Sequence, residues 1–322
     1  MLSIIATGDF LKKQLSHYWL TKHVKMKRIV LITNFLLAVL LSHHCLGQAY
    51  SALKAQPPLN SINIFIRDDV YNDYQQFVAG RDVLAITDFT GKNIRRDVVD
   101  MIIAQQALKL GGFNYSFSYS PGKVNFRNTR LLQTGKLLIS FDSYWSSDAL
   151  AIESDVYISD AVIRKGEYVA GIYTSVKNSA VLAIKNRADL ENFTAVSTPK
   201  WRTDWATLQA LPLKKLIRED EWLSMARMVN IGWVDFLLMP FNSTADQSFH
   251  LGKITLVPVK NIAIMLNDSR HFVISKKHPQ GKSALNAINI GLAKLRKQGA
   301  IVKAYRQAGF FIDTSNIKIL NK

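Results

Sequence analysis

The chain has 322 residues but only one cysteine, Cys45, and seven histidines. One cysteine cannot form an intramolecular disulfide, so the core alone has to stabilise the fold. If the leader proposed below is removed, Cys45 leaves with it and only His250, His271 and His278 remain, without the close spacing of metal ligands. We therefore exclude a thiol nucleophile and expect no metal site and no cofactor.

The sequence signatures of several enzyme classes are also missing. The chain contains no Gly-x-Ser-x-Gly elbow, no phosphate-binding loop and no dinucleotide-binding fingerprint. The neighbouring carboxylates of Asp68 and Asp69 would diverge at a strand end and would not form an acid–base pair. No run of Lys and Arg is interleaved with aromatic residues, as nucleic-acid binding favours. We expect neither catalysis nor a nucleic-acid partner.

The chain also lacks an obvious membrane-spanning segment. Its most apolar stretch, Ile29–Leu41, is thirteen residues long, which is too short for a bilayer core of about 30 Å. Lys27 and Arg28 precede it and small residues follow at Gly47 and Ala49, an order typical of a cleaved secretory signal. A membrane anchor is the alternative.

We therefore predict an N-terminal extension and signal peptide over 1–47, with the signal itself at 26–47, and a periplasmic protein. Met1 and Met26 both remain open as the translation start. Removal of 1–47, with six basic residues and one acidic residue, lowers the net charge from +17 to +12. A basic exported protein favours anionic partners such as membrane head groups, cell-wall polymers and small acids.

The remaining chain shows a pattern of alternating strands and helices after a polar linker over 48–60 with Pro57 and Pro58. Two successive α/β series indicate two lobes, and the last elements are too few for a third. The βαβ rhythm favours a mostly parallel sheet. The expected strands are 62–66, 113–119, 137–141, 180–184, 193–196, 212–217, 234–239, 260–266 and 272–275, and the main helices 94–110, 128–134, 221–232 and 283–298.

Because the C-terminal part returns to the first series, we place the first lobe at 61–175 and 262–322 and the second at 176–261. Two crossing segments then join the lobes, an arrangement used for hinge closure around a ligand.

Several phrases in this order resemble the amino-acid type of periplasmic solute-binding proteins, family three. They are Leu131-Leu132-x-x-Gly135 before 137–142, the crossover-like 159–166, Asn230-x-Gly232-x-Val234-Asp235-Phe236, Ile290-Gly291-Leu292 with Leu295-Arg296 and Gly299, and Tyr305 to Phe310. The resemblance spans about 62–312. It implies an α/β, two-lobed type II periplasmic-binding-protein fold with a ligand cleft and two hinge crossovers.

One departure limits what the resemblance implies about the ligand. Members that bind α-amino acids usually carry an arginine for the ligand carboxylate where this chain has Glu153-Ser154-Asp155. Amino-acid specificity is therefore not carried over. Arg164, beyond this phrase, is a candidate for an anion, and a salt bridge or a solvated strand end is the alternative.

Candidate ligand contacts lie at the carboxyl ends of strands. In the second lobe, Ser197–Trp205 lies between a strand and a helix start, where free backbone N–H groups attract anions. Simple helix capping and packing of its aromatic residues is the alternative. From this segment we select Ser197, Thr198, Trp201, Arg202 and Thr203.

In the first lobe, Asp142 and Trp145 follow one expected strand, and Trp145 could stack on a planar or cationic ligand. Asp68 and Tyr71 follow the first strand, and Asn242 follows the last strand of the second lobe. An aromatic plug at a strand end and a capped surface loop are the corresponding structural alternatives.

The leading hypothesis is a monomeric solute-binding protein that captures a small polar molecule and presents it to an inner-membrane ABC permease. The alternative is a sensory or interaction module of the same fold that signals to a membrane receptor. A lobe pair that binds no small molecule is a third reading, which requires Ser197–Trp205 to be buried. The sequence does not determine the ligand or its charge.

Overall fold

The computed structural model describes residues 61–122, 125–242 and 244–322. The predicted leader over 1–47 and the linker over 48–60 lie outside the described residues. No helix in the described ranges has the length and hydrophobicity needed to cross a membrane.

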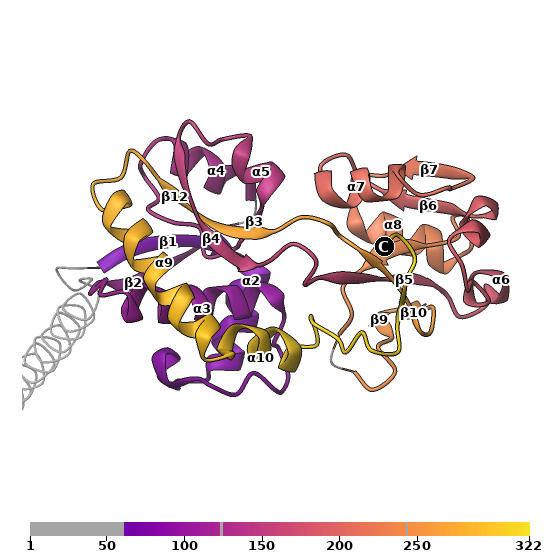
Figure 1. Ribbon diagram of the computed structural model, residues 1–322, viewed down its shortest axis with the longest axis horizontal. Coiled ribbons are helices and arrows are strands. Elements are labelled where there is room, and N and C mark those ends of the chain that lie inside the picture. The colour runs from indigo at the N-terminus through magenta and orange to yellow at the C-terminus, as the bar shows by residue number, and fades with distance from the viewer. Residues whose placement is uncertain (1–60, 123–124, 243) are drawn as a thin grey trace, which may run out of the picture. The chain divides into compact units, whose positions relative to one another are not determined.

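The first lobe contains the N-terminal elements and, after the second lobe, a strand and two helices that return to it (Figure 1). Its elements are β1 (Ser61–Arg67), α2 (Asp68–Val78), the 3-10 helix η1 (Val83–Ala85), α3 (Arg96–Leu110), β2 (Ser116–Gly122), α4 (Asn125–Gln133), β3 (Tyr144–Trp145), α5 (Ser146–Leu150), β4 (Val156–Ile163), β12 (Arg270–Ser275), α9 (Gly281–Lys297) and α10 (Ala300–Gln307).

The second lobe contains the middle of the chain and a short C-terminal strand. Its elements are β5 (Val169–Ser175), α6 (Ser179–Leu182), η2 (Ala188–Asn192), β6 (Thr194–Ser197), α7 (Arg202–Gln209), β7 (Lys215–Arg218), α8 (Trp222–Asn230), β8 (Leu237–Met239), β9 (Phe249–Leu251), β10 (Ile254–Pro258), β11 (Ile262–Met265) and β13 (Lys318–Ile319).

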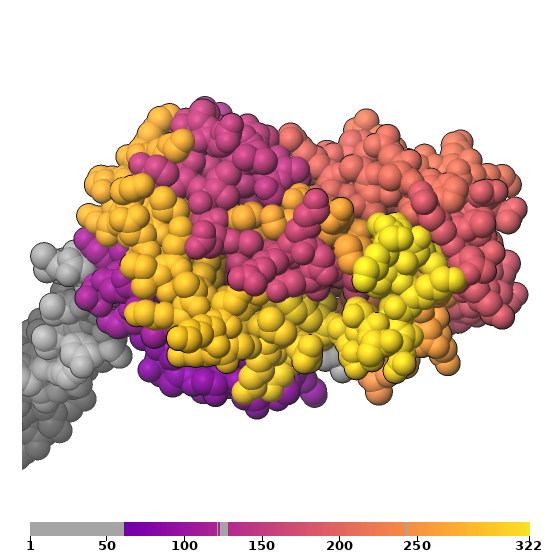
Figure 2. Space-filling view, viewed as in Figure 1, coloured from indigo at the N-terminus to yellow at the C-terminus, as the bar shows by residue number. Residues whose placement is uncertain are grey.

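The chain crosses between the lobes at 164–168 and 266–269, because β5 and β11 pair with each other in the second-lobe sheet. These crossings differ from the lobe boundaries expected at 175/176 and 261/262. After α10 the chain reaches the second lobe again, where β13 pairs with β11. In the space-filling view this C-terminal segment, in yellow, covers part of one face of the second lobe (Figure 2).

The expectation of a mostly parallel sheet is wrong. β1 pairs with β2, and β6 with β7, in parallel. However, β12 pairs antiparallel with β3 and β4, and β5 pairs antiparallel with β8, β10 and β11. Strands that return through short hairpins, such as β9 and β10 around Gly252, produce antiparallel neighbours. The sequence pattern did not reveal that hairpin.

Two segments that were expected to be strands have another conformation in the structure. Residues 180–184 were expected to form a strand, but α6 begins there because the side chain of Asn178 accepts a hydrogen bond from the backbone N–H of Val181 at 3.2 Å. In 137–141 only Ile139 forms a bridge, to Ile274 of β12. Residues 137–141 are buried throughout and residues 180–184 are buried in part, and hydrophobicity alone did not distinguish their conformations.

The core of the first lobe contains α3, which is buried on nearly all faces and packs against α9. Val98, Ile102, Ile103 and Ala107, expected at core spacing, are fully buried, whereas Leu110 at the end of the helix is 41% exposed. The two helices approach closely at two glycines. Gly111, at the end of α3, lies against the backbone of Ala287 in α9, and Gly291 of α9 lies against the backbone of Ala107 in α3.

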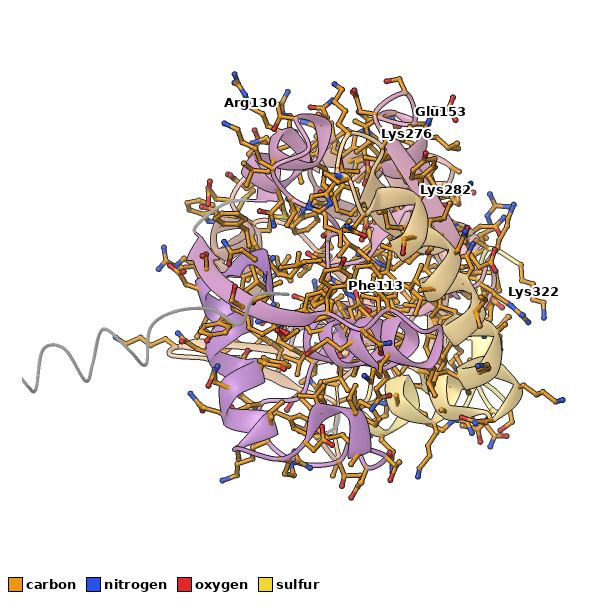
Figure 3. The ribbon with its side chains drawn as sticks, turned by 90° about the vertical axis from the view of Figure 1, so that its left-hand side faces the viewer. Phe113, Arg130, Glu153, Lys276, Lys282 and Lys322 are labelled. Atoms are coloured by element: carbon orange, nitrogen blue, oxygen red, sulfur yellow. The ribbon has the colours of Figure 1, made fainter. Side chains whose placement is uncertain are left out.

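The loop before α9 is held to the rest of the first lobe by polar contacts. Lys276 Nζ donates to the backbone carbonyl of Glu153 at 2.6 Å, and the ammonium groups of Lys276 and Lys282 lie 5.7 and 5.2 Å from the ring centre of Tyr157. Figure 3 shows Glu153, Lys276 and Lys282 gathered at one end of this lobe. These basic side chains are therefore engaged on the outside of the lobe, away from the site described next.

Candidate functional site

A cavity of about 810 Å³ lies between the lobes and is lined by both of them. Its volume is within the range of small-molecule sites. Among the described residues its lining has six cationic and four acidic side chains, and four of the cations also pair with carboxylates just outside the lining, those of Asp69, Asp73, Asp100 and Asp220. The charged residues are Arg67, Arg95, Arg96, Asp97, Asp142, Asp148, Lys200, Arg202, Asp204 and Arg270, and the aromatic ones are Tyr144, Trp145, Tyr168, Trp201, Trp222, Phe241, Phe249 and Phe310.

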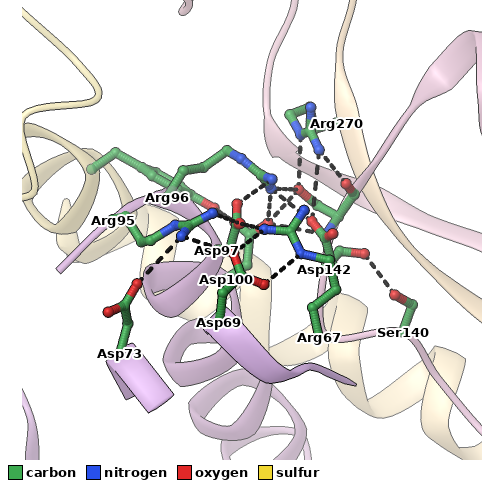
Figure 4. Close-up of polar contacts among 12 residues, drawn as sticks. Arg67, Asp69, Asp73, Arg95, Arg96, Asp97, Asp100, Ser140, Asp142 and Arg270 are labelled. Carbon is green, nitrogen blue, oxygen red and sulfur yellow. Dashed lines mark hydrogen bonds and ion pairs between the residues drawn. The ribbon is translucent and has the colours of Figure 1, made fainter. Parts of the chain in front are cut away.

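The first-lobe wall is a network of arginines and aspartates (Figure 4). Arg96, in the first turn of α3, contacts Asp97, and its Nη1 lies 2.5 Å from Asp100, one turn along the same helix. The same nitrogen lies 2.9 Å from Asp142, which follows the segment 137–141. The i to i+4 spacing of Arg96 and Asp100 therefore presents one guanidinium to carboxylates from two parts of the lobe.

The pKa values of two carboxylates in this network shift in opposite directions. Burial alone would raise the pKa of Asp97, but the guanidinium groups of Arg96, Arg95 and Arg67 together lower it to about 2. Burial raises the pKa of Asp100, which is fully buried and accepts hydrogen bonds from Ser143 and from the hydroxyl of Tyr305. The network is therefore satisfied internally and holds the start of α3 in place.

Arg270, at the start of β12, is less fully compensated than Arg96. Its side chain is 11% exposed, donates to the hydroxyl and the backbone carbonyl of Ser143, and lies 3.9 Å from the nearest oxygen of Asp142. Burial and the neighbouring Arg96 lower the pKa of Arg270. Its guanidinium carbon lies 4.6 Å from the ring centre of Trp145, a cation–π contact. A buried cation with incomplete compensation favours an anion in the cavity.

The second-lobe wall contributes Asp204, in the first turn of α7. Burial raises the pKa of this carboxyl to about 6, partly opposed by Arg270 from the first lobe. Tyr168, in the first crossing segment, is buried, and its ring stacks on Phe310 with 4.2 Å between centres. The cavity therefore brings an arginine of one lobe and an aspartate of the other within electrostatic reach.

Asp204→Asn is expected to stabilise the ligand-free protein at pH 7.5 and to leave it unchanged at pH 4. The folded carboxyl binds its proton more tightly than the unfolded one, so its contribution to stability falls as the pH rises from about 4 to about 6. The full difference is on the order of 3 kcal/mol or less. Thermal unfolding of both proteins at the two pH values measures this difference, and a lower melting temperature of the variant at pH 7.5 would contradict the prediction.

The lobes touch beside the cavity where α5 faces α7 (Figure 1). Nε of Arg202 lies 3.3 Å from a carboxylate oxygen of Asp148. Nearby, the hydroxyl of Thr203 donates to Asp268 at 3.1 Å, and the same carboxylate oxygen accepts the backbone N–H of Ser147 at 3.3 Å. These polar contacts join both lobes and the second crossing segment.

Five of the predicted ligand contacts line the cavity. Asp142 and Trp145 lie on the first-lobe wall, where Trp145 is 8% exposed. On the other wall, Trp201 is 36% exposed, Arg202 pairs with Asp148, and the side chain of Asn242 donates to the carbonyl of Ser248 at 3.0 Å. Their binding roles remain predictions.

The other six predicted contacts lie away from the cavity lining. Asp68 and Tyr71 belong to the first turn of α2, where the Tyr71 hydroxyl accepts from Gln75. Arg164 is exposed in the first crossing segment. The remaining three are buried and lie at the end of β6 and the start of α7: Ser197, Thr198, which donates to Asp220, and Thr203, which donates to Asp268.

Sequence reasoning did not select Arg96, Arg270 or Asp204 as site residues. Arg95-Arg96-Asp97 at the start of an apolar helix, with Asp100 one turn later, was a usable signal because charged residues are rarely placed on a helix buried all round. Arg270 had no comparable signal, since only the return of the chain from the second lobe brings it beside Trp145. Within the described ranges no cluster of His, Cys, Asp and Glu could hold a metal ion.

Neither a family model nor a curated protein matches this sequence. Among solved structures, the periplasmic VFT2 domain of BvgS from Bordetella pertussis is similar with a TM-score of 0.52 and 14% identity, over 77% of this chain and 93% of that domain. The chain therefore has the two-lobed type II periplasmic-binding-protein fold. The fold predicted from the sequence is confirmed.

Two further binding-protein structures are similar at lower TM-scores. The ancestral amino acid-binding protein AncCDT-1, described as a precursor of cyclohexadienyl dehydratase, has a TM-score of 0.47 and 18% identity over 78% of this chain and 96% of that one. Substrate-binding domain 2 of GlnP from Lactococcus lactis, in an open conformation, has a TM-score of 0.47 and 15% identity over 79% and 97%. At these identities the likeness concerns the fold and not the ligand.

Proposed function

We propose that this protein is a monomeric periplasmic solute-binding protein that takes a small polar ligand into the cavity between its lobes. It then presents the ligand to an inner-membrane ABC transporter and does not convert it. The observation that carries the proposal is the cavity, with an arginine wall from one lobe and aromatic and polar side chains from the other. Arg270, which is largely buried and lies 3.9 Å from the nearest oxygen of Asp142, favours a ligand with an anionic group.

A thermal-shift screen of organic acids, amino acids, sugars and wall fragments tests the proposal. A ligand at a hundredfold excess over its dissociation constant should stabilise the protein by about 2.7 kcal/mol. Trp201→Ala is expected to lower this shift markedly without lowering the melting temperature of the free protein, because Trp201 is 36% exposed in the cavity wall. Trp145 is less suitable for this test, since it is buried and packs on Tyr168 and Arg270.

Trp233→Ala serves as the matched control, because Trp233 is 76% exposed and lies outside the cavity lining. It should leave the ligand shift unchanged. No shift with any compound, or equal shifts in the two variants, would contradict binding at this cavity.

The transport step is tested separately in cells that lack the protein. Reduced uptake of the ligand identified in the screen, with the ligand recovered unchanged from the purified protein, supports delivery to a transporter. Unchanged uptake together with loss of a ligand-dependent transcriptional response would instead favour the sensory role.

A further inference from the structure

An exposed apolar cluster lies in the second lobe and has no part in the cavity. Its side chains are among the most exposed large hydrophobic residues of the described chain: Trp233 at 76%, Ile231 at 56%, Val176 at 51% and Leu251 at 48%. Together with Lys177, Arg227 and Lys253 we call this surface the tip patch. Trp233 is the most exposed tryptophan in the described part of the chain, and such exposure in a contiguous patch marks an interaction surface.

Three turns of the chain form the tip patch, and specific contacts hold them together. The side chain of Asn230, next to Ile231, accepts the backbone N–H of Thr255 at 2.9 Å, and Leu251 pairs with Ile254 across the β9–β10 hairpin. Ser175, next to Val176, pairs with Leu256. These contacts place the turns after β5 and α8 beside the hairpin.

A further bond joins the turn after β5 to the residues that follow Trp233. The side chain of Asn178 donates to Asp235 at 3.2 Å. Val176 and Trp233, each two residues from this bond, therefore lie in adjacent turns. The patch is built from the ends of packed elements and not from a single loop.

The tip patch lies at the end of the second lobe that is far from the hinge. β5 begins just after the first crossing segment and extends for seven residues, about 20 Å, before it reaches Val176. Figure 1 shows β5 crossing this lobe toward α6. A partner at the tip patch would therefore leave the cavity and the facing α5 and α7 accessible.

The charge of the tip patch has one sign. Lys177, Arg227 and Lys253 are exposed, and the segments 175–178, 227–234 and 250–255 contain no acidic residue; Asp235, which follows, is half-buried, and its carboxylate accepts hydrogen bonds from Asn178 and Thr194. A second copy of the chain is a poor partner, because an isologous contact would bring these cations against themselves. Exposed Trp and aliphatic residues flanked by Lys and Arg match the interface of an anionic bilayer, where the aromatic ring lies at head-group depth and the cations bind lipid phosphates.

We propose that the tip patch binds the surface of an anionic phospholipid bilayer, with Trp233 and Ile231 inserted among the head groups and Lys177, Arg227 and Lys253 on the phosphates. This contact holds the second lobe at the membrane and leaves the cavity free. It does not depend on which ligand the cavity takes.

Vesicle flotation tests the proposal with the purified chain and variants prepared identically. The vesicles contain phosphatidylcholine alone or with an equal part of phosphatidylglycerol. We expect binding to the anionic vesicles only, weakened by salt. Trp233→Ser should lower the partition coefficient roughly tenfold or more, and Lys177→Gln with Lys253→Gln about fivefold per charge. Trp201→Ser, at an exposed tryptophan of the cavity wall, should leave it unchanged.

Each other outcome would overturn the proposal. Absence of flotation removes the membrane contact. If Trp233→Ser and the unchanged chain bind the anionic vesicles equally, and also bind a soluble polyanion equally, then net charge alone explains the vesicle binding. Self-association in sedimentation velocity that Trp233→Ser abolishes, without vesicle binding, assigns the patch to a second copy. Circular dichroism of each variant confirms that its fold is retained.

Discussion

Arg96→Met is expected to lower the free energy of unfolding by about 3–5 kcal/mol, the usual cost of removing one partner from a buried charge network. Arg96 is 16% exposed and contacts Asp97, Asp100 and Asp142, of which Asp100 is fully buried. Methionine fills a similar volume but leaves these carboxylates without their shared guanidinium. Urea unfolding of the variant and the unchanged protein measures the difference.

Arg202→Met is the matched control. Arg202 also pairs with an aspartate, but its side chain is 58% exposed, and such pairs contribute about 0–1 kcal/mol. Arg96→Lys keeps the charge but cannot bridge several carboxylates, so we expect an intermediate loss. Similar stability of Arg96→Met and Arg202→Met would contradict the role assigned to the network.

Acid unfolding provides a second measure of the same network. The pKa of Asp97 in the folded protein, about 2, is lower than its value of 3.8 in the unfolded chain. The unfolded chain therefore binds more protons between pH 4 and pH 2, and the stability that Asp97 contributes above pH 4 is lost over that interval. Arg96→Met should reduce this loss, because the guanidinium that lowers the pKa is gone.

Gly291→Val is expected to destabilise the first lobe by roughly 3 kcal/mol or more through overpacking. A Cβ atom at Gly291 would lie 1.9 Å from the backbone oxygen of Ala107, and one at Gly111 would lie 1.9 Å from that of Ala287. Both obstacles are backbone atoms, so α3 and α9 would have to separate along their whole contact. Thermal unfolding monitored by circular dichroism measures the loss.

Ile290→Ala, one residue earlier on α9, is the control for the effect of a substitution at an exposed position of this helix. Ile290 is 49% exposed, so its truncation should change stability by about 0.5 kcal/mol or less. If Gly291→Val were as stable as Ile290→Ala, the close crossing of α3 and α9 would be wrong.

Strongly periodic segments were predictable because burial on one side leaves a regular pattern. The helix expected over 94–110 is α3, and that over 283–298 is α9, each within two residues at either end. Short apolar segments were not predictable in this way. The sequence Ala180-Val181-Leu182 in α6 suits a buried strand or a buried helical turn equally, and the cap from Asn178 decides between the two. Strand direction was also mispredicted, because pairing partners are chosen in three dimensions.

The site residues likewise include some that local sequence rules could select and some that they could not. Trp145, Trp201 and Arg202 could be selected because polar and aromatic residues after a strand lie at the edge where ligands bind. Thr198 and Thr203 satisfied the same rule, but both are buried and donate hydrogen bonds to Asp220 and Asp268. A local rule cannot tell whether a hydroxyl faces the cavity or a neighbouring carboxylate.

By itself the sequence determined the fold class, the two-lobed organisation and the basic character of this protein, because these follow from hydrophobic periodicity, chain order and composition. Only the tertiary structure decided where the chain crosses between lobes, which charges meet, and which surfaces stay exposed. Arg96, Arg270 and Asp204 are far apart in the chain, and their electrostatics arise from burial and from distances that folding alone creates. The exposure of Trp233 likewise depends on what packs around its turn, which no local pattern records.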